Sequence, residues 1–600
     1  MNPEPEQDLE AAATGEGVPV APGMGPILTR MRIPVDRTLI DSRAVVICAM
    51  SMVLAAVTGL IAQLLVATIH FVTNVAFYGR LSARPVSPAG HHLGWIVVLV
   101  PAAGGIIVGL MARYGSRAIR GHGIPEAMEQ VLLNESRIPA RVMFLKPLSA
   151  AISIGTGGPF GAEGPIIATG GAMGSVVGQI VKTSAMERKT LLAAGAAAGM
   201  AATFGTPVSA VLLAIELLLF ELRPRSIAAV ALASVTATAV RVGFVGYVPA
   251  FPMPALARPT EPALALYVLL GAIVGCLSVY VTRFVYWVED RFEHLPVHWM
   301  WWPAIGGLAV GAIGFFAPRT LGVGYENIDD LLSGRLLGTA ALVLCTLKFL
   351  SWSISLGSGT SGGTLAPLLT IGGGAGVAAG TLAARLLPAA PLDLRICALV
   401  GMAAMFAGAS RALLASVVFA FETTLQPIGL LPLLGGCTAG YLVSSLLMRN
   451  TIMTEKLARR GVRVPSEYAA DYLDLVNVAD ACSMNVVTVR ADEPISALRR
   501  LAATHQGFPV VDGEGNLVGV VTRRDFLDLT KPDSTLARDL ITRPPAVIFL
   551  DNSLRDAADQ MVRENVGRLP VVERSNPRHV VGFITRSDLL RAHERRLAQA

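Results

Sequence analysis

The sequence predicts a multi-pass all-α membrane protein that is followed by a small cytoplasmic α/β pair. Its 600 residues are 53% hydrophobic and only 15% charged, which is too apolar for a soluble chain of this length. Apolar runs long enough to cross a bilayer recur from about residue 44 to about residue 448. Beyond residue 450 the chain becomes charged and polar and contains two similar short units.

The N-terminal tail, residues 1–38, is rich in Pro, Gly, Glu and Ala, and we expect it to be disordered. It lacks the apolar core of a cleavable signal peptide. Arg30, Arg32, Arg37 and Arg43 flank the start of the first span and favour a cytoplasmic N-terminus. We therefore expect an integral protein of a bacterial inner membrane with both termini in the cytoplasm. The net charge of +6 fits this bias and does not indicate nucleic-acid binding.

Residues 39–453 are expected to form the membrane domain, which contains an internal repeat. The stretch "GAEGPIIATGGAMG" (161–174) aligns with "GTLAPLLTIGGGAG" (363–376) at an offset of 202, and the same offset aligns "GMAATF" (199–204) with "GMAAMF" (401–406). Several apolar stretches in this region are broken by Gly or Pro. Broken helices in corresponding halves point to a binding site near the midplane.

Three glycine-rich motifs predict where such helices begin: "GHGIPE" (121–126), "GAEGP" (161–165) and "GGTLAP" (362–367). A helix that starts inside a membrane presents unpaired amides and the positive end of its dipole. Converging, three such ends form an anion site that needs no Lys or Arg. Weak binding of this kind is what fast conduction requires.

Glu163 places a carboxylate inside the second motif, where an ionisable side chain is costly and usually functional. Ionised, it can occupy the place of the anion; protonated or displaced, it leaves that place open. We therefore predict that Glu163 is a gate, a proton carrier, or both. The alternative is a structural carboxylate that caps its own helix.

With these motifs in this order, the chain from about residue 40 to residue 595 resembles the CLC family of chloride channels and chloride/proton exchangers. The resemblance implies two inverted halves of tilted and broken helices, one pore per subunit and a homodimer in the bilayer. It also implies that Glu163 is the gating glutamate and that the amides of Thr364 and Leu365 help to coordinate the anion. The expected anion site comprises Gly121, His122, Gly123, Ile124, Pro125, Gly161, Gly164, Pro165, Gly363, Thr364, Leu365 and Met453.

Three positions depart from the family pattern. His122 stands where relatives often have serine, Met453 where they often have tyrosine, and Leu365 where phenylalanine is common. The imidazole of His122 can replace one missing hydroxyl donor, or it can point elsewhere and leave the backbone amides to act alone. Leu217 occupies the place of the proton-relay glutamate of some exchangers, with Glu216 and Glu221 nearby.

Residues 454–475 are expected to be a linker, and residues 476–532 and 536–595 resemble a pair of CBS modules. Each contains two β-like runs followed by a Thr-x-x-Asp step, in "GVVTRRD" and "GFITRSD". The resemblance implies an adenine nucleotide (ATP, ADP or AMP) at Thr522 and Asp525 and at Thr585 and Asp588. The alternative is a structural pair in which these residues cap helices.

The sequence therefore predicts transport of chloride or a similar small anion. Leu217 favours a passive channel over a proton-coupled antiporter, and both remain open. A divalent-cation channel is more remote, because such a site needs several oxygen ligands. We expect no enzymatic activity, since no H-E-x-x-H pattern occurs. The six cysteines form no CxxC pair and indicate neither a metal site nor a disulfide framework.

Overall fold

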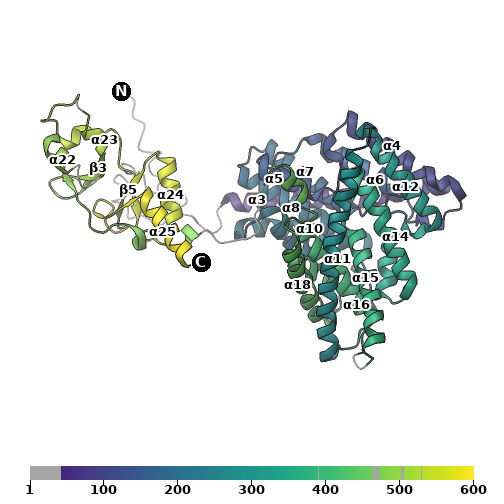
Figure 1. Cartoon of the computed structure of the whole chain (residues 1–600). Coiled ribbons are helices and arrows are strands. Elements are labelled where there is room, and N and C mark those ends of the chain that lie inside the picture. The colour runs from purple at the N-terminus through teal and green to yellow at the C-terminus, as the bar shows by residue number, and fades with distance from the viewer. Residues whose placement is uncertain are drawn as a thin grey trace. The chain divides into compact units, whose positions relative to one another are not determined.

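The structure, a computed structural model of the chain, describes residues 31, 42–388, 391–462, 464, 472–501, 506–528 and 530–599. It divides into two compact units (Figure 1). The membrane unit spans 42–467, and the tail unit combines 1–41 with 468–600.

The membrane unit consists of two halves with the same order of helices. The first half contains α3 (Ser42–Tyr78), α4 (Leu99–Tyr114), α5 (Ile124–Leu133), α6 (Ala140–Gly155), α7 (Glu163–Ile180), α8 (Ala185–Phe204), α9 (Pro207–Ala214) and α10 (Pro224–Val245). The second contains α11 (Glu261–Glu293), α12 (Trp302–Phe316), α13 (Tyr325–Leu332), α14 (Gly338–Gly357), α15 (Leu365–Leu386), α16 (Leu394–Ser410), α17 (Leu413–Thr424) and α18 (Leu430–Leu447). The short helix α19 (Glu455–Arg459) follows.

Helix lengths in this unit are uneven, as the sequence predicts. Within the described residues, 8 helices are long and apolar enough to cross a membrane. The helix α5 has 10 residues, and a helix of that length rises about 15 Å, roughly half of a hydrocarbon core. The mostly helical fold with a strand-and-helix tail confirms the predicted fold class.

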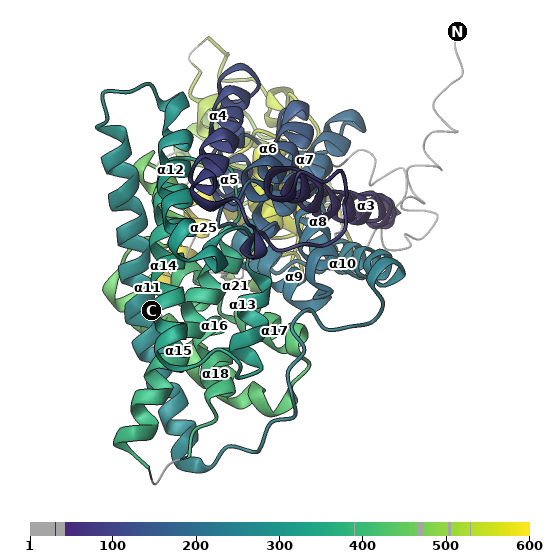
Figure 2. The same ribbon diagram turned by 90° about the vertical axis from the view of Figure 1, so that its right-hand side faces the viewer.

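The repeated glycines have a packing reason. In the first half, α7 crosses α8 so closely that a Cβ on Gly170 would lie 2.1 Å from the carbonyl oxygen of Gly195. In the second half, α15 crosses α16 in the same way, and a Cβ on Gly372 would lie 2.4 Å from the carbonyl oxygen of Gly401. Both views show α15 and α16 side by side (Figures 1 and 2). Small residues let the helix backbones of a membrane protein approach this closely.

The tail unit contains two small sheets of identical topology. They are β1 (Val489–Arg490), β2 (Gly507–Val511) and β3 (Leu517–Thr522), then β4 (Ile548–Phe549), β5 (Arg568–Val572) and β6 (Val580–Thr585). In each sheet the first pair is parallel and the second is antiparallel. The registers correspond, because Gly507 faces Thr522 as Arg568 faces Thr585.

Short helices complete the two modules and cover the sheets. They are α20 (Tyr472–Leu475), α21 (Val478–Ala481), α22 (Ile495–Leu501), α23 (Arg523–Phe526), α24 (Leu554–Arg563) and α25 (Arg586–Gln599). Much of the predicted linker, at 463 and 465–471, lies outside the described residues. The predicted disordered tail also lies outside them except for Met31, which is buried against Leu517 and Phe549 of this unit.

Candidate functional site

The three glycine-rich motifs, far apart in the sequence, meet backbone to backbone. Gly161 and Gly363 form an antiparallel bridge: the Gly161 amide donates to the Gly363 carbonyl at 3.2 Å, and the Gly363 amide donates to the Gly161 carbonyl at 2.9 Å. Gly121 pairs with Ser361 in a parallel bridge, and its carbonyl accepts from the Gly362 amide at 3.4 Å.

Glycine is required at this meeting point because the backbones leave no room for side chains. A Cβ on Gly164 would lie 2.2 Å from the carbonyl oxygen of His122 and 2.9 Å from the Cα of Gly363. Gly123 has a backbone φ of +95°, which residues other than glycine rarely adopt, and a Cβ there would lie 2.5 Å from the Gly164 carbonyl oxygen. The close approach of the three motifs therefore depends on glycine at these positions.

Three helices begin at this convergence. The first helical residue is Ile124 in α5, Glu163 in α7 and Leu365 in α15. Their unpaired amides and dipole ends favour an anion. Thr364 immediately precedes α15 and is buried, as are Ile124, Pro125, Pro165 and Leu365. The structure thus gathers the three motifs of the predicted anion site.

Glu163 is completely buried at this convergence. Its Oε1 accepts a hydrogen bond from the Tyr325 hydroxyl at 2.6 Å, while its Oε2 has no hydrogen-bond partner within the described part of the chain. The carboxylate lies over Gly161, where a Cβ would come within 1.7 Å of Oε2. Only one oxygen of this carboxylate is therefore engaged by another side chain, although burying a carboxylate is costly.

Tyr325 is a site residue that the sequence reasoning missed. It starts α13 and packs edge-on against Phe204 and Phe251, each at 5.8 Å between ring centroids. Phe419 packs on Phe204 at 4.9 Å. A signal was available: "GVGYEN" (322–327) has the G-x-G spacing of "GHGIPE" (121–126), so that Tyr325 occupies the repeat position of Ile124.

Two buried lysines fix the loops that lead into α5 and α13. The Lys146 ammonium donates to the carbonyls of Ile119 and Gly121, both at 2.8 Å. The Lys348 ammonium donates to the carbonyls of Thr320 at 3.0 Å and of Gly322 at 2.7 Å. Lys146 and Lys348 are 202 positions apart, so the repeat preserves this support as well as the glycines.

The Glu126 side chain secures the first motif and connects it to α19. Its Oε2 accepts from the Gly123 amide at 2.7 Å, and its Oε1 pairs with the Lys456 ammonium at 2.7 Å. Arg460 pairs with Glu129 one turn further along α5. The segment that leaves the membrane unit is thus tied to α5, the helix that follows His122 in the chain.

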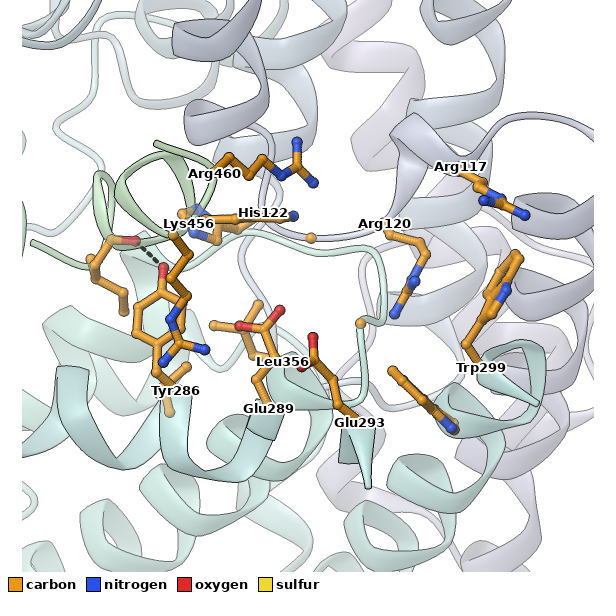
Figure 3. A pocket seen from close by; sticks show the side chains of 16 residues that line it. Arg117, Arg120, His122, Tyr286, Glu289, Glu293, Trp299, Leu356, Lys456 and Arg460 are labelled. Atoms are coloured by element: carbon orange, nitrogen blue, oxygen red, sulfur yellow. Dashed lines mark hydrogen bonds between the residues drawn. The ribbon is translucent and has the colours of Figure 1, made fainter. Parts of the chain in front are cut away.

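His122 lines a cavity of about 550 Å³ on one side of the convergence (Figure 3). The side chain is 6% exposed, and its Nδ1 has no hydrogen-bond partner within the described residues. Glu289 and Glu293 point into the cavity from α11. Five basic side chains line the cavity: Arg117, Arg120, Lys456, Arg459 and Arg460. The last three form ion pairs with acids outside the wall, so Arg117 and Arg120 are the basic groups that face the two lining carboxylates.

Met453 is fully buried in the core of the membrane unit and does not line this cavity. Its neighbour Ile452 does line the cavity, and the Ile452 carbonyl accepts from the Tyr286 hydroxyl at 2.9 Å (Figure 3). The structure therefore brings His122, but not the Met453 side chain, to the cavity wall.

Leu217 is buried in a π-helical turn, Ile215–Leu219, and the two acids near it are engaged elsewhere. The Glu216 carboxylate accepts from the amides of Leu414 and Ala415, both at 3.0 Å, where α17 begins. Glu221 accepts from the Ser226 hydroxyl at 3.0 Å. Both acids are thus hydrogen-bonded to groups other than those at Leu217.

In the tail unit, Thr522 and Asp525 line a second cavity, of about 590 Å³. The Asp525 carboxylate accepts from both the amide and the hydroxyl of Thr522 at 2.7 Å. Asp588 holds Thr585 in the same way, at 2.8 and 2.7 Å. Thr585 and Asp588 are not part of the wall of this cavity.

Comparison with known proteins identifies both units. Residues 104–445 match the family described as voltage gated chloride channel. The chain belongs to this family. Residues 478–531 and 537–595 each match the CBS domain. The family and the CBS pair are those that the sequence motifs predict.

Among the curated relatives, the chain is 31% identical over 448 residues to the H(+)/Cl(-) exchange transporter ClcA of Salmonella typhi, covering 72% of this chain and 92% of that protein. It is 28% identical over 564 residues to the chloride channel protein CLC-f of Arabidopsis thaliana, covering 80% and 71%.

Solved structures share the fold. A slow cyanobacterial Cl-/H+ antiporter superposes with a TM-score of 0.61 at 24% identity, covering 70% of this chain and 98% of that one. A eukaryotic CLC transporter superposes with a TM-score of 0.58 at 21% identity, covering 90% and 97%.

Proposed function

We propose that the chain transports chloride, or a similar small anion, through the convergence of α5, α7 and α15, with Glu163 as its gate. The observation that carries the proposal is the buried carboxylate of Glu163 at helix ends that favour an anion. A carboxylate and a chloride ion compete for the same positive environment. The pathway is therefore closed while the ionised carboxylate occupies it.

Each neighbour has a part in this mechanism. Arg117 and Arg120 in the wall of the cavity at His122 attract anions before they reach the convergence. The Nδ1 of His122 offers a donor to a passing anion when it carries a proton. The Tyr325 hydroxyl holds the Glu163 carboxylate in place until protonation or an arriving anion releases it. Divalent cations are disfavoured, because helix N-termini repel them.

Anion flux through purified protein in liposomes tests the proposal. Vesicles loaded with chloride should release it only when they contain the protein, and replacing chloride by one anion at a time should give the selectivity order. Release of magnesium or calcium at a rate comparable to that of chloride would contradict the assignment.

Proton-coupled exchange is the second candidate. It is supported by relatives named as H(+)/Cl(-) exchange transporters, which match over 92% of their own length. Against it stands Leu217 at the relay position. A chloride gradient across liposomes, with charge build-up prevented by a potassium ionophore, should separate the two. Uphill proton movement indicates an antiporter, and chloride flux without proton movement indicates a channel.

We also propose that two copies of the chain associate through α9 and α17. Glu216, in the turn that follows α9, and Glu422, in α17, are only partly buried and lie beside the exposed apolar residues Leu414 and Val208. A partly exposed carboxylate facing lipid is costly, and a second copy would cover it. Cross-linking of cysteines introduced at Val208 and Leu414 in membranes should give dimers.

The remaining parts of the proposal concern the tail and the membrane. The CBS pair binds an adenine nucleotide and regulates transport, which is supported by the cavity at Thr522 and Asp525.

Both termini face the cytoplasm of a bacterial inner membrane, which is supported by the basic residues before α3. Protease digestion of inverted and right-side-out vesicles tests the orientation, because only inverted vesicles should lose the tail.

A further inference from the structure

We infer that the tail cavity selects a polyphosphate: it takes a nucleoside di- or triphosphate in preference to a monophosphate, at one site per chain. This inference rests on the proposed nucleotide binding and names the part of the ligand that the cavity recognises. It comes from the charge of the cavity wall rather than from the Thr-x-x-Asp step.

Four arginines line the cavity against a single carboxylate, that of Asp525. They come from the start of α23, from the segment before β4 and from the start of β5: Arg523, Arg524, Arg543 and Arg568. Guanidinium groups bind phosphate through paired, charge-assisted hydrogen bonds. The cavity therefore has an excess of three positive charges for an anionic ligand to neutralise.

Two of these arginines are available to a ligand. The side chains of Arg523 and Arg524 are exposed and form no ion pair within the described part of the tail unit. Arg568 is partly buried; burial lowers the pKa of its guanidinium, and only the charge of Asp525 opposes that shift. A phosphate group would supply the missing counter-charge more completely than the one carboxylate.

The same cavity has an apolar side that fits the rest of a nucleotide. Leu540, Pro545 and Ala546 are buried in its wall, and Val520 and Val566 are partly buried there. A volume of about 590 Å³ lies within the range of small-ligand sites, which is roughly 300–1,000 Å³. The wall thus offers apolar contact to a base and positive charge to a phosphate chain.

The second module does not repeat this arrangement. Thr585 and Asp588 keep the same internal hydrogen bonds, but Ser587 stands at the position that corresponds to Arg524. Thr585 and Asp588 do not line the cavity. Asp588→Ala therefore removes an equivalent cap without touching the ligand, and it serves as a matched control for Asp525→Ala.

The test is calorimetric titration of the purified full-length protein with ATP, ADP, AMP, adenosine and inorganic tripolyphosphate. Each phosphate removed should weaken binding by roughly tenfold, the effect of about one charge-assisted contact. The double variant Arg523→Gln, Arg524→Gln should bind ATP and AMP almost equally. Arg563→Gln, an exposed arginine outside the cavity, and Asp588→Ala should leave the preference for ATP unchanged.

The outcomes separate the two proposals. If ATP and AMP bind equally to the unaltered protein, the polyphosphate inference is wrong while nucleotide binding stands. If tripolyphosphate binds as tightly as ATP and adenosine does not bind, the polyphosphate inference stands and the nucleotide assignment is wrong. If none of the five compounds binds at millimolar concentration, both are wrong.

Discussion

At the scale of single residues, one hydroxyl group and one glycine fix the position of the Glu163 carboxylate. Tyr325 donates to Glu163 at 2.6 Å, and Gly161 leaves the space that the carboxylate fills. The sequence was sufficient to identify Glu163, because an acid among broken helices is unusual. The G-x-G spacing marks Tyr325 as the start of a helix, but its contact with Glu163 joins residues 162 positions apart and becomes visible only when the two halves are folded together.

Tyr325→Phe should raise chloride flux at neutral pH. The change removes the donor and keeps the ring between Phe204 and Phe251. A hydrogen bond to a charged group is worth about 1.5–3 kcal/mol, so the carboxylate should leave its place roughly ten to a hundred times more often. Chloride efflux from liposomes measures this. Tyr280→Phe, an exposed tyrosine on α11, is the control, and equal flux in both variants would exclude a holding role for Tyr325.

Gly161→Ala should displace the Glu163 carboxylate. The new Cβ would lie 1.7 Å from Oε2, and the three nearest atoms all belong to Glu163. We expect faster chloride flux at neutral pH and a weaker dependence on pH. Gly243→Ala in α10 is the matched control, because nothing lies within 4 Å of its added Cβ. A Gly161→Ala variant that folds and keeps the original pH profile would show that the carboxylate can remain beside the added methyl group without loss of the gate.

At the scale of helices, a glutamate from each half of the membrane unit caps the start of a helix in the other half. Glu216, after α9, accepts from the first amides of α17, and Glu422, in α17, accepts from the amides of Val208 at 3.0 Å and Ser209 at 2.8 Å in α9. The sequence repeat at an offset of 202 covers α7 and α15. It does not extend to Glu216 and Glu422, which are 206 positions apart because a π-helical turn follows α9. The reciprocal caps could therefore not be predicted from the repeat.

Glu216→Ala or Glu422→Ala should each destabilise the membrane unit by about 1 kcal/mol, the usual effect of losing a helix cap. The double variant should lose less than the sum of the two, because both caps hold the same pair of helices. Thermal unfolding in detergent measures the midpoints. The control is Glu261→Ala, which changes an exposed acid in the first turn of α11. If this control lowers the unfolding midpoint as much as Glu216→Ala and Glu422→Ala do, the two glutamates have no special role as caps.

At the scale of the whole molecule, each unit has its own hydrophobic core, so the tail should be removable without unfolding the membrane unit. A chain that ends at residue 464 retains Lys456 and its ion pair with Glu126. We expect it to transport chloride without any response to nucleotide. A chain that ends at residue 453 loses that ion pair and should transport poorly. Equal activity of the two truncated chains would show that α19 does not support the first motif.

Composition, the two repeats and the glycine motifs were enough to predict the membrane fold and the tail modules. They could not show that His122 lines a cavity while Met453 is buried in the core, because Met453 and its neighbour Ile452, which does line the cavity, lie differently in the same loop. Nor could they show that four arginines from separate segments gather in the tail, since that depends on how the two modules pack against each other.

The central claim is that the ionised Glu163 carboxylate closes the anion pathway, and Glu163→Gln tests it most directly. Glutamine has nearly the same shape, still accepts from Tyr325 and carries no charge, so it mimics the protonated state. We expect chloride flux through the unaltered protein in liposomes to rise as pH falls, because protons neutralise the carboxylate. Flux through Glu163→Gln should be high and independent of pH. An unchanged rate and pH profile in this variant would contradict the account.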